Sequence, residues 1–239
     1  MNPFRICFLA LLLMVSVKVG AQSIYLLSVG VADYPGTRND LILPAQDAIA
    51  MHRLYQQNAN ATSVLLTNTL ASKSRVLSEA STLFRKAKVE DIVVFFFSGH
   101  GGKGGFYAQD GFLGYDEIRR LFSQCRARNK MIFADACFSG DMRENTEHSF
   151  TDPKNNVMLF LSSRDNECSI ENPRMRNGFF AACLLRSLKG GADTDRNRII
   201  TAKELFTAVS KGVRDLSRDT QHPVMWGNFD DTMPVMIWK

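Results

Sequence analysis

The chain has 239 residues, of which 45% are apolar and 22% charged, and its formal net charge is +5 at pH 7. This composition is that of a globular protein long enough to bury a sizeable core, and it excludes collagen-like, disordered and multi-span membrane chains. Without the first 21 residues the charge is +3, from 27 Lys and Arg against 24 Asp and Glu. So mild an excess gives no reason to expect nucleic acid as a partner.

The N-terminus has the pattern of a secretory signal peptide. Arg5 precedes an apolar run over residues 6–17, and small residues follow up to Ala21, after which we expect cleavage. About twelve apolar residues would span only ~18 Å as a helix, against a bilayer core of ~30 Å, so no stable membrane anchor is expected after cleavage. We therefore expect a signal peptide over residues 1–21, one mature domain over residues 22–239, and export to the periplasm or the medium.

Beyond the signal, apolar runs alternate with segments of helical periodicity, as in a mostly parallel sheet covered by helices on both faces. The predicted strands cover residues 24–31, 64–67, 91–98, 130–135, 157–162 and 235–238. The predicted helices cover residues 45–58, 72–88 with Ser72 as N-cap, 115–126, 178–189 and 201–216. No repeat, low-complexity run or linker divides the chain. The predicted fold class is therefore α/β, as one domain with a six-stranded sheet.

Two predicted strands end in residues that can carry chemistry. The segment IVVFFFSGHGGKGGF places His100 among glycines, and KMIFADACFSGD places Cys137 after the next strand. The carboxyl ends of parallel strands meet at one edge of a sheet, so the two side chains can meet if their strands are neighbours. The pair fits a Cys/His dyad, in which His100 takes the thiol proton and returns it to the leaving amine. The backbone N–H groups of Gly101 and Cys137 are the expected oxyanion donors.

The blocks SGHGG and DACFSG resemble the two signature blocks of the caspase-like cysteine peptidases, specifically the metacaspase branch and its bacterial relatives. Weaker similarity extends to GVADYPG, LSSRDNECS and GADTDRNRIITAKEL, so the resemblance covers most of the mature chain. It implies a caspase-type αβα sandwich and an endopeptidase with His100 as base and Cys137 as nucleophile. It also implies protein or peptide substrates with Arg or Lys before the scissile bond.

The same resemblance implies a pocket for that basic side chain. Asp135 stands two residues before the nucleophile, where caspases that cut after Asp carry Gln, and a carboxylate there suits Arg or Lys. The metacaspase pattern adds a Ser two residues before the His and an Asp after the first strand, which correspond to Ser98 and Asp47. The family more often has Asn-Asp where this chain has Gln46-Asp47. An Asp in a first helical turn is also favoured by the helix dipole alone.

Residues 193–204 admit two interpretations. Six of them fall at positions 1, 3, 5, 7, 9 and 12 of a calcium-binding EF-hand loop: Asp193, Asp195, Asn197, Ile199, Thr201 and Glu204. Position 6, normally Gly, is Arg198, and Thr201 with Glu204 has the pattern of a capping box at a helix start. We favour the capped turn and predict no cofactor. Several metacaspases need calcium through acidic residues elsewhere, for which Asp141 is the loose candidate here.

The segment over residues 140–156 is almost free of apolar residues and lies between two buried strands. Such loops are either tolerated insertions or functional, and its place next to Cys137 favours function. The resemblance adds that caspase relatives are often cut in this region. A protease selective for basic residues could cut its own loop after Arg143 or Lys154.

Four cysteines remain beyond the signal, and in an oxidising compartment they could form two disulfides. Cys183, however, lies inside an apolar helical pattern, where a small buried thiol is the simpler interpretation, and Cys125 is similar. The disulfide state of Cys125, Cys168 and Cys183 stays open. Buried free thiols at Cys125 and Cys183 are the favoured interpretation.

Two other functions fit parts of the sequence. GHGGKG at residues 99–104 matches the dinucleotide fingerprint G-x-G-x-x-G, but further glycines continue where that fingerprint needs a helix, and Cys137 would have no role. A catalytically silent binding module on the same fold is the stronger alternative, because a fold does not guarantee activity. Thiol labelling distinguishes an active peptidase from this silent module, since a dyad thiolate at Cys137 reacts and a buried structural thiol does not.

Overall fold

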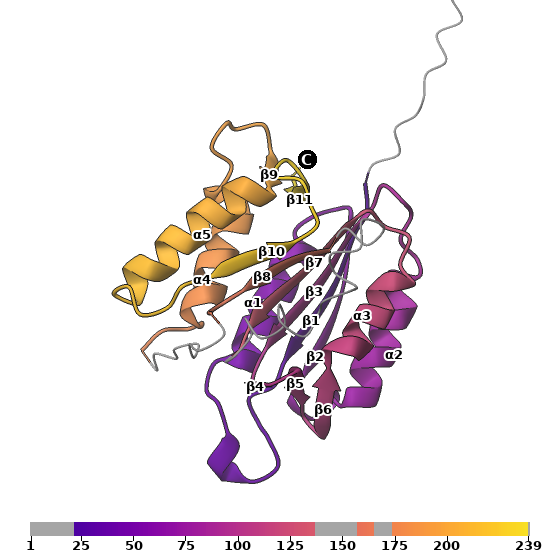
Figure 1. Ribbon diagram of the computed structural model, residues 1–239, viewed down its shortest axis with the longest axis vertical. Coiled ribbons are helices and arrows are strands. Elements are labelled where there is room, and N and C mark those ends of the chain that lie inside the picture. Colours follow the sequence, from indigo (N-terminus) through magenta and orange to yellow (C-terminus); the bar gives the residue numbers. More distant parts are fainter. Residues whose placement is uncertain (1–21, 137–156, 165–173, 239) are drawn as a thin grey trace, which may run out of the picture.

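The computed structural model describes residues 22–136, 157–164 and 174–238, and every structural statement below concerns these residues. Its centre is a six-stranded sheet in the order β10-β8-β7-β3-β1-β2 (Figure 1). Five strands are parallel: β1 (Ile24–Gly30), β2 (Ala61–Thr67), β3 (Ile92–Ser98), β7 (Asn129–Asp135) and β8 (Val157–Leu161). The edge strand β10 (Val224–Gly227) is antiparallel to β8. The expected mostly parallel six-stranded sheet is thus confirmed.

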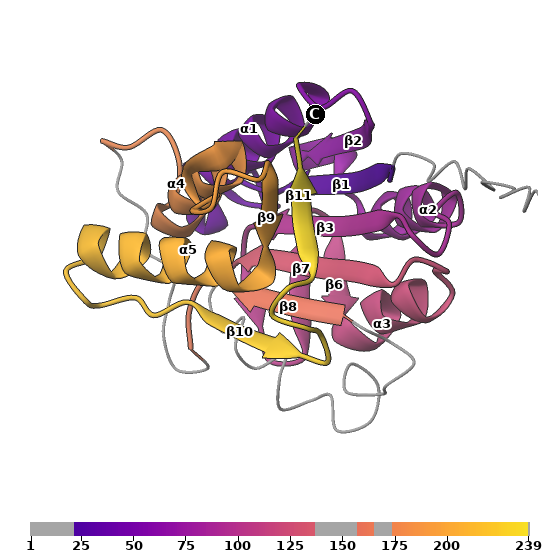
Figure 2. The same cartoon turned by 90° about the horizontal axis from the view of Figure 1, so that it is seen from above.

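Helices cover both faces of the sheet, as Figures 1 and 2 show. One face carries α2 (Lys73–Phe84) and α3 (Tyr115–Ser123). The other carries α1 (Pro44–Gln56), α4 (Phe179–Arg186) and α5 (Ala202–Leu216). Every residue of β3 is buried, and successive side chains alternate between the two cores, which is why this strand reads as an unbroken apolar run. The fold is therefore the αβα sandwich that the resemblance implied.

Single turns connect these elements at several points. They are the 3-10 turns η1 (Thr37–Asn39) and η2 (Asn68–Leu70), and the π-helical turn η5 (Ser187–Gly191), which continues α4. The predicted N-cap Ser72 is present, and its hydroxyl accepts a hydrogen bond from the Arg75 N–H. None of the helices in the described part of the chain combines the length and the apolar character that crossing a membrane requires.

One predicted strand belongs to a different sheet from the one expected. The strand predicted at residues 235–238 is present as β11 (Pro234–Ile237), but it pairs with β9 (Ile199–Thr201) in a separate two-stranded sheet. The sixth strand of the central sheet is β10, which the sequence analysis missed. Its four residues, Val-Met-Trp-Gly, are all half-buried, and so short an apolar run without alternation does not distinguish a strand from other structure.

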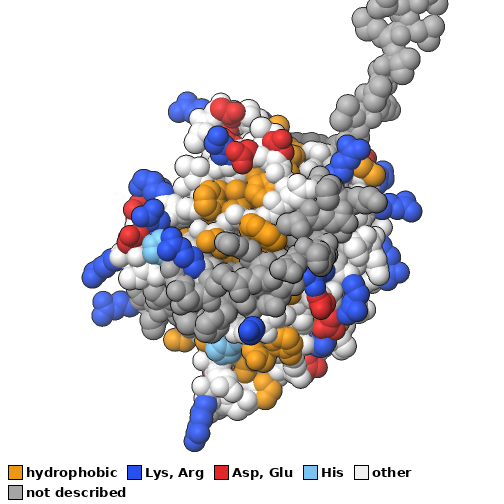
Figure 3. All heavy atoms as spheres, viewed as in Figure 1, with side chains coloured by type: hydrophobic (Ala, Val, Ile, Leu, Met, Phe, Trp, Pro, Cys, Tyr) orange, Lys and Arg blue, Asp and Glu red, His pale blue; other side chains and the backbone are white. Residues whose placement is uncertain are grey.

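The glycine-rich stretch after β3 is also structured. It forms a small antiparallel sheet of β4 (Gly101–Gly102), β5 (Gly105–Ala108) and β6 (Gly111–Gly114). Tyr107 and Phe112 on this sheet remain 44% and 39% exposed and pack edge to face. In Figure 3 hydrophobic side chains gather at the lower end of the molecule, where Figure 1 places β5 and β6. The small sheet therefore presents an apolar surface at the carboxyl end of β3.

Candidate active site

The strands that lead to His100 and Cys137 are neighbours in the sheet. β3 and β7 are parallel and in register, with Ser98 opposite Asp135, and the Gly99 N–H donates to the Asp135 carbonyl at 3.2 Å. His100 and Cys137 each follow this matched pair by two residues, so the sequence-based condition that their strands be adjacent is met. Cys137 itself, like the loop over residues 140–156, lies outside the described residues.

The imidazole of His100 is held by the main chain before α1. Its Nε2 lies 2.8 Å from the carbonyl oxygen of Asn39, in η1. A carbonyl oxygen only accepts hydrogen bonds, so Nε2 carries the proton and donates it. In the neutral ring Nδ1 is then the basic nitrogen. The Asn39 carbonyl thus selects the tautomer in which Nδ1 is available to accept a proton.

Tyr34 connects His100 to the small sheet. The Tyr34 hydroxyl accepts a hydrogen bond from the His100 backbone N–H at 2.8 Å and donates one to the Tyr107 carbonyl at 3.1 Å. The Tyr34 and His100 rings also pack together, with centroids 4.7 Å apart. Burial raises the pKa of Tyr34, so its hydroxyl stays protonated and can donate. The sequence analysis missed this residue, although it lies in the block GVADYPG that carried part of the resemblance.

Gly99 makes this close approach possible. Its φ is +155°, and a Cβ at this position would lie 2.7 Å from the Tyr34 hydroxyl oxygen. Any side chain would therefore displace the phenol that holds the His100 backbone. This explains one of the glycines that flank His100 in the sequence.

The pairing of β4 with β5 fixes the direction of the Gly101 backbone N–H. Gly101 lies opposite Phe106 in the β4–β5 pair, and beside it the Tyr107 N–H donates to the His100 carbonyl at 2.9 Å. In an antiparallel ladder the residue next to such a hydrogen-bonded pair belongs to a non-hydrogen-bonded pair. The Gly101 N–H consequently points away from β5, on the side of β4 that the small sheet does not use.

Three polar residues that the resemblance assigned to substrate binding lie close together near the carboxyl ends of β3 and β7. Asp47, Ser98 and Asp135 are 1%, 2% and 7% exposed, and they come from α1, β3 and β7. The Ser98 hydroxyl donates to Asp47 Oδ2 at 3.0 Å. Asp47 thus directs its carboxylate across to other elements, and the helix-dipole explanation does not account for its contacts.

The N-terminus of α4 completes this polar group. Asp47 Oδ1 accepts hydrogen bonds from the Asn177 side chain at 2.8 Å and from the Gly178 N–H at 3.1 Å. Asp135 Oδ2 accepts one from the Ala181 N–H at 3.2 Å. Helix N-termini stabilise negative charge, so α4 holds both carboxylates. The sequence analysis missed Asn177 and Gly178, although a Gly directly before an apolar helix is a signal for an N-cap.

The electrostatics of Asp47 favour a cationic ligand. Burial, and after it the nearby charge of Asp135, raise the pKa of Asp47 to about 8, although the hydrogen bonds from Asn177, Ser98 and Gly178 act to lower it. A second negative charge in this buried space is therefore costly without a compensating positive charge. A bound guanidinium or ammonium group would supply that charge.

Ser162, which follows β8, fixes the end of β7. Its hydroxyl lies 3.3 Å from the Ala136 N–H, from which it accepts, and 3.4 Å from the Ala136 carbonyl, to which it donates. The Ser162 carbonyl in turn accepts from the buried Gln221 side chain at 2.9 Å. The residue directly before Cys137 is thus tied to the neighbouring strand.

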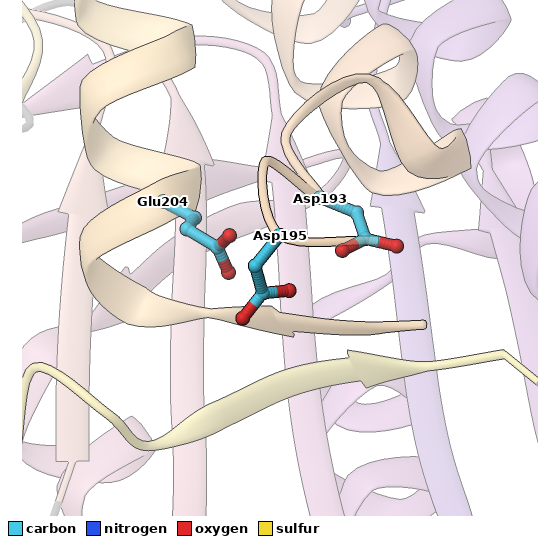
Figure 4. A group of neighbouring side chains, drawn as sticks. All are labelled: Asp193, Asp195 and Glu204. Carbon is cyan, nitrogen blue, oxygen red and sulfur yellow. The ribbon is translucent and has the colours of Figure 1, made fainter. Parts of the chain in front are cut away.

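The acidic residues of the EF-hand-like segment lie away from this site, at the start of α5. Carboxylate oxygens of Asp193, Asp195 and Glu204 lie within 4.8 Å of one another (Figure 4). Each accepts hydrogen bonds from its own loop, and the capping box predicted from Thr201 and Glu204 is present. Burial raises the pKa of Glu204, but hydrogen bonds from Thr194 and Thr201 outweigh it and hold the pKa near 2. These contacts serve the turn and the helix start.

Cys125 and Cys183 are free and buried, as expected. Burial raises the pKa of both thiols, that of Cys183 to about 11. Neither thiol therefore has the depressed pKa of a reactive cysteine. Cys137 and Cys168 lie outside the described residues.

Most of the chain is similar to a known protein family and to a solved structure. Residues 25–233 match the family model of the caspase domain, peptidase C14. The solved structure of protein GSU0716 from Geobacter sulfurreducens, a structural genomics target, is similar to this chain with a TM-score of 0.70 and 17% identity. That similarity covers 91% of this chain and 100% of the other, and at this identity it concerns the fold. A comparison with curated proteins found no match.

Proposed function

The chain belongs to the caspase-domain family, and on this premise we propose that it is a cysteine endopeptidase that cleaves peptide bonds after Arg or Lys. The observation that carries the proposal is the hydrogen bond between His100 Nε2 and the Asn39 carbonyl. It presents Nδ1 as a base at the carboxyl end of β3, beside the strand that leads to Cys137. A Cys/His dyad needs a base near the nucleophile, and the adjacency of the two strands supports this assignment.

In the proposed reaction, His100 Nδ1 accepts the proton of the Cys137 thiol, and the thiolate sulfur attacks the carbonyl carbon of the scissile bond. The carbonyl electron pair moves to oxygen, and the N–H groups of Gly101 and Cys137 stabilise the oxyanion. The tetrahedral intermediate collapses, the C–N bond breaks, and the imidazolium gives its proton to the leaving amine. Water, deprotonated by His100, then hydrolyses the thioester and restores the thiol.

Specificity for a basic side chain is supported by Asp47 and Asp135. Both are buried carboxylates, and Ser98 and Asn177 fix the orientation of Asp47 by hydrogen bonds at 3.0 and 2.8 Å. Desolvated carboxylates form strong charge-assisted hydrogen bonds with guanidinium and ammonium groups. An acidic substrate side chain would meet like charge instead, at a cost of several kcal/mol.

The direct test is hydrolysis of matched fluorogenic peptides by the mature chain. The peptides differ in the residue before the scissile bond, which is Arg, Lys, Asp or Leu, and each is measured with calcium and with chelator. We expect turnover of the Arg and Lys peptides, and its loss in folded Cys137→Ala and His100→Ala variants. Wild-type rates in the Cys137→Ala protein, or a preference for Asp or Leu, would contradict the proposal. No hydrolysis under any condition would favour the silent binding module.

We also propose that the protein is exported and that Ala21 is the last residue removed. The basic and apolar pattern of residues 1–21 supports this. N-terminal sequencing of protein recovered from the periplasm or the medium should begin at Gln22. Recovery of the full chain from the cytosol alone would contradict it.

A further inference from the structure

The small sheet carries two exposed aromatic rings on one of its faces. Tyr107 and Phe112 lie opposite each other in the β5–β6 pair and are 44% and 39% exposed. Their rings pack edge to face, with centroids 5.3 Å apart, and form one continuous apolar surface. We call this pair the aromatic surface. Contiguous exposed apolar groups, unlike single scattered ones, are typical of binding sites.

The two rings are held against bare backbone. A Cβ at Gly102 would lie 2.9 Å from a ring carbon of Tyr107, and one at Gly105 would lie 2.7 Å from a ring carbon of Phe112. Each ring therefore rests on a glycine of β4 or β5, and a side chain at either glycine would displace it. The opposite face of the small sheet is anchored in the core by the fully buried Phe106. The aromatic surface is thus a fixed platform.

The aromatic surface begins next to the proposed base. The Tyr107 N–H donates to the His100 carbonyl at 2.9 Å. The Tyr107 carbonyl accepts from the hydroxyl of Tyr34, which also holds the His100 backbone N–H. Gly102, on which the Tyr107 ring rests, directly follows Gly101, the proposed oxyanion donor. A substrate whose scissile bond lies at His100 and Gly101 therefore passes close to the Tyr107 ring.

The aromatic surface and the pocket for a basic side chain belong to opposite faces of the central sheet. The small sheet is anchored in the core on the side of α2 and α3, whereas Asp47 lies on α1, on the other side (Figure 1). In the proposed reaction the side chain before the scissile bond points toward Asp47 and Asp135, and the leaving amine takes its proton from His100. The segment that leaves with this amine consequently extends from His100 toward the small sheet.

We propose that Tyr107 and Phe112 are specificity-determining residues: the aromatic surface binds a large apolar side chain directly after the scissile bond. This inference rests on the proposed function. A Leu or Phe side chain placed on the two rings removes apolar area of both partners from water, and the rings lose little freedom because they are already fixed. A small polar side chain gains little there. The substrate class is therefore a chain with Arg or Lys before the scissile bond and a large apolar residue after it.

The test compares internally quenched peptides that are identical except for the residue after Arg, which is Leu, Ser or Asp. The measured quantity is the ratio of kcat/KM for the Leu peptide to that for the Ser peptide, in which every common contribution cancels. We expect a ratio of roughly ten in the wild type, the scale of a small apolar contact in a specificity site. In Tyr107→Thr and in Phe112→Thr the ratio should fall toward one. Thr suits a strand, so these substitutions retain the strand propensity of the small sheet.

The matched control is Val89→Thr. Val89 is also 44% exposed, but it precedes β3, at the opposite end of that strand from His100, and this variant should retain the wild-type ratio. Phe112→Lys adds a gain of preference, because its ammonium group attracts a carboxylate. It should raise the ratio of the Asp peptide to the Ser peptide by roughly threefold, the scale of an exposed ion pair. Misfolding cannot produce such a gain.

Equal rates with the Leu and Ser peptides in the wild type would overturn the inference. So would a Leu preference that persists in the folded Thr variants, or the failure of all three ring variants to fold, because the rings would then serve folding. The proposed function fails in a different way: no peptide would be cleaved after Arg, and the Arg ketone would modify Cys137 no faster than its Asp analogue. Cleavage after Arg regardless of the next residue leaves the proposed function standing and refutes the role of the aromatic surface.

Discussion

Tyr34 and His100 are joined twice, by a hydrogen bond of 2.8 Å from the His100 backbone N–H to the Tyr34 hydroxyl and by the packing of their rings. Because the same hydroxyl donates to the Tyr107 carbonyl, one phenol links the proposed base to the small sheet. The backbone of His100 and the direction of the Gly101 N–H therefore depend on the same group. Tyr34 is a positioning residue for the proposed base and oxyanion donor.

We predict that Tyr34→Phe lowers kcat roughly tenfold with little change in KM, since the ring remains while a part-buried N–H loses its partner, at a stability cost of about 1–2 kcal/mol. Tyr55→Phe is the matched control. Tyr55 is buried in α1, and its hydroxyl has no hydrogen-bond partner among the described residues. Steady-state kinetics and urea unfolding of both variants check this. An unchanged kcat in Tyr34→Phe would show that the ring alone positions His100.

Asp135→Ala should reduce kcat/KM for Arg peptides by roughly thirtyfold or more, because losing one partner of a buried charge pair costs about 2–5 kcal/mol. Asp91→Asn is a suitable comparison, since Asp91 is also buried but accepts hydrogen bonds from the backbone of Ser23 and Lys88. It should lower stability and leave the preference among substrates unchanged. Equal effects of both variants on that preference would refute the role of Asp135.

The affinity for basic substrates should depend on pH through Asp47, whose pKa is raised to about 8 by burial and by the charge of Asp135. A cation favours the ionised carboxylate, so KM for an Arg peptide should fall as the pH rises toward about 8 and level off above it. The free energy of unfolding should also fall over this range. The folded state binds more protons than the unfolded state between the two pKa values, so this group lowers the free energy of unfolding as the pH rises from about 4 to 8.

Asp47→Asn tests this pH dependence, because an amide does not titrate in this range. KM measured from pH 6 to 9 should then vary less than in the wild type, and so should the urea midpoint. A variant that retains the full wild-type dependence would assign the titration to another group.

The capped turn before α5 predicts a stability effect without a catalytic one. Thr201→Ala removes the hydroxyl that accepts from the Glu204 N–H, and loss of such a cap costs about 1 kcal/mol. Urea unfolding should show the loss, peptide hydrolysis should not change, and millimolar calcium should leave the midpoint unaltered. A rise of several degrees in Tm with calcium in the wild type, absent in Glu204→Gln, would favour the EF-hand interpretation.

Arg143 and Lys154 lie outside the described residues, and the prediction for them rests on sequence. A protease selective for basic residues should cut its own loop, and the loop has so few apolar residues that a nick should cost the core little. Intact mass of the purified mature chain should show two fragments that split after Lys154 or Arg143, and Cys137→Ala should stay whole. A single full-length species in a demonstrably active preparation would show that cleavage is not required.

Long, fully buried strands could be predicted from sequence, and short half-buried ones could not. β3 is an unbroken apolar run because both of its faces are covered, whereas β10 offers four half-buried residues with no periodic pattern. The position of β11 could be predicted from sequence, but the sheet to which it belongs could not. Its pairing with β9 depends on tertiary packing that no local pattern records.

The site shows a similar division. Placing His100 at a strand end needed only the apolar run and the glycines, and Ser98 and Asp47 came from the resemblance. Asn177 and Gly178 could not be predicted, because their contact with Asp47 joins residues 130 and 131 positions apart in the sequence. Only the packing of α4 beside α1 brings them together.

We propose Cys137 as a nucleophile that His100 activates beside a pocket for basic side chains. Mass mapping of the mature chain after brief reaction with an acyloxymethyl ketone that carries Arg tests it most directly. We predict one adduct, on Cys137, that forms far more slowly with the Asp analogue and in His100→Ala. The buried Cys125 and Cys183, with their raised pKa values, should remain unmodified as internal controls. An unmodified Cys137, or equal rates with the Arg and Asp reagents, would contradict the claim.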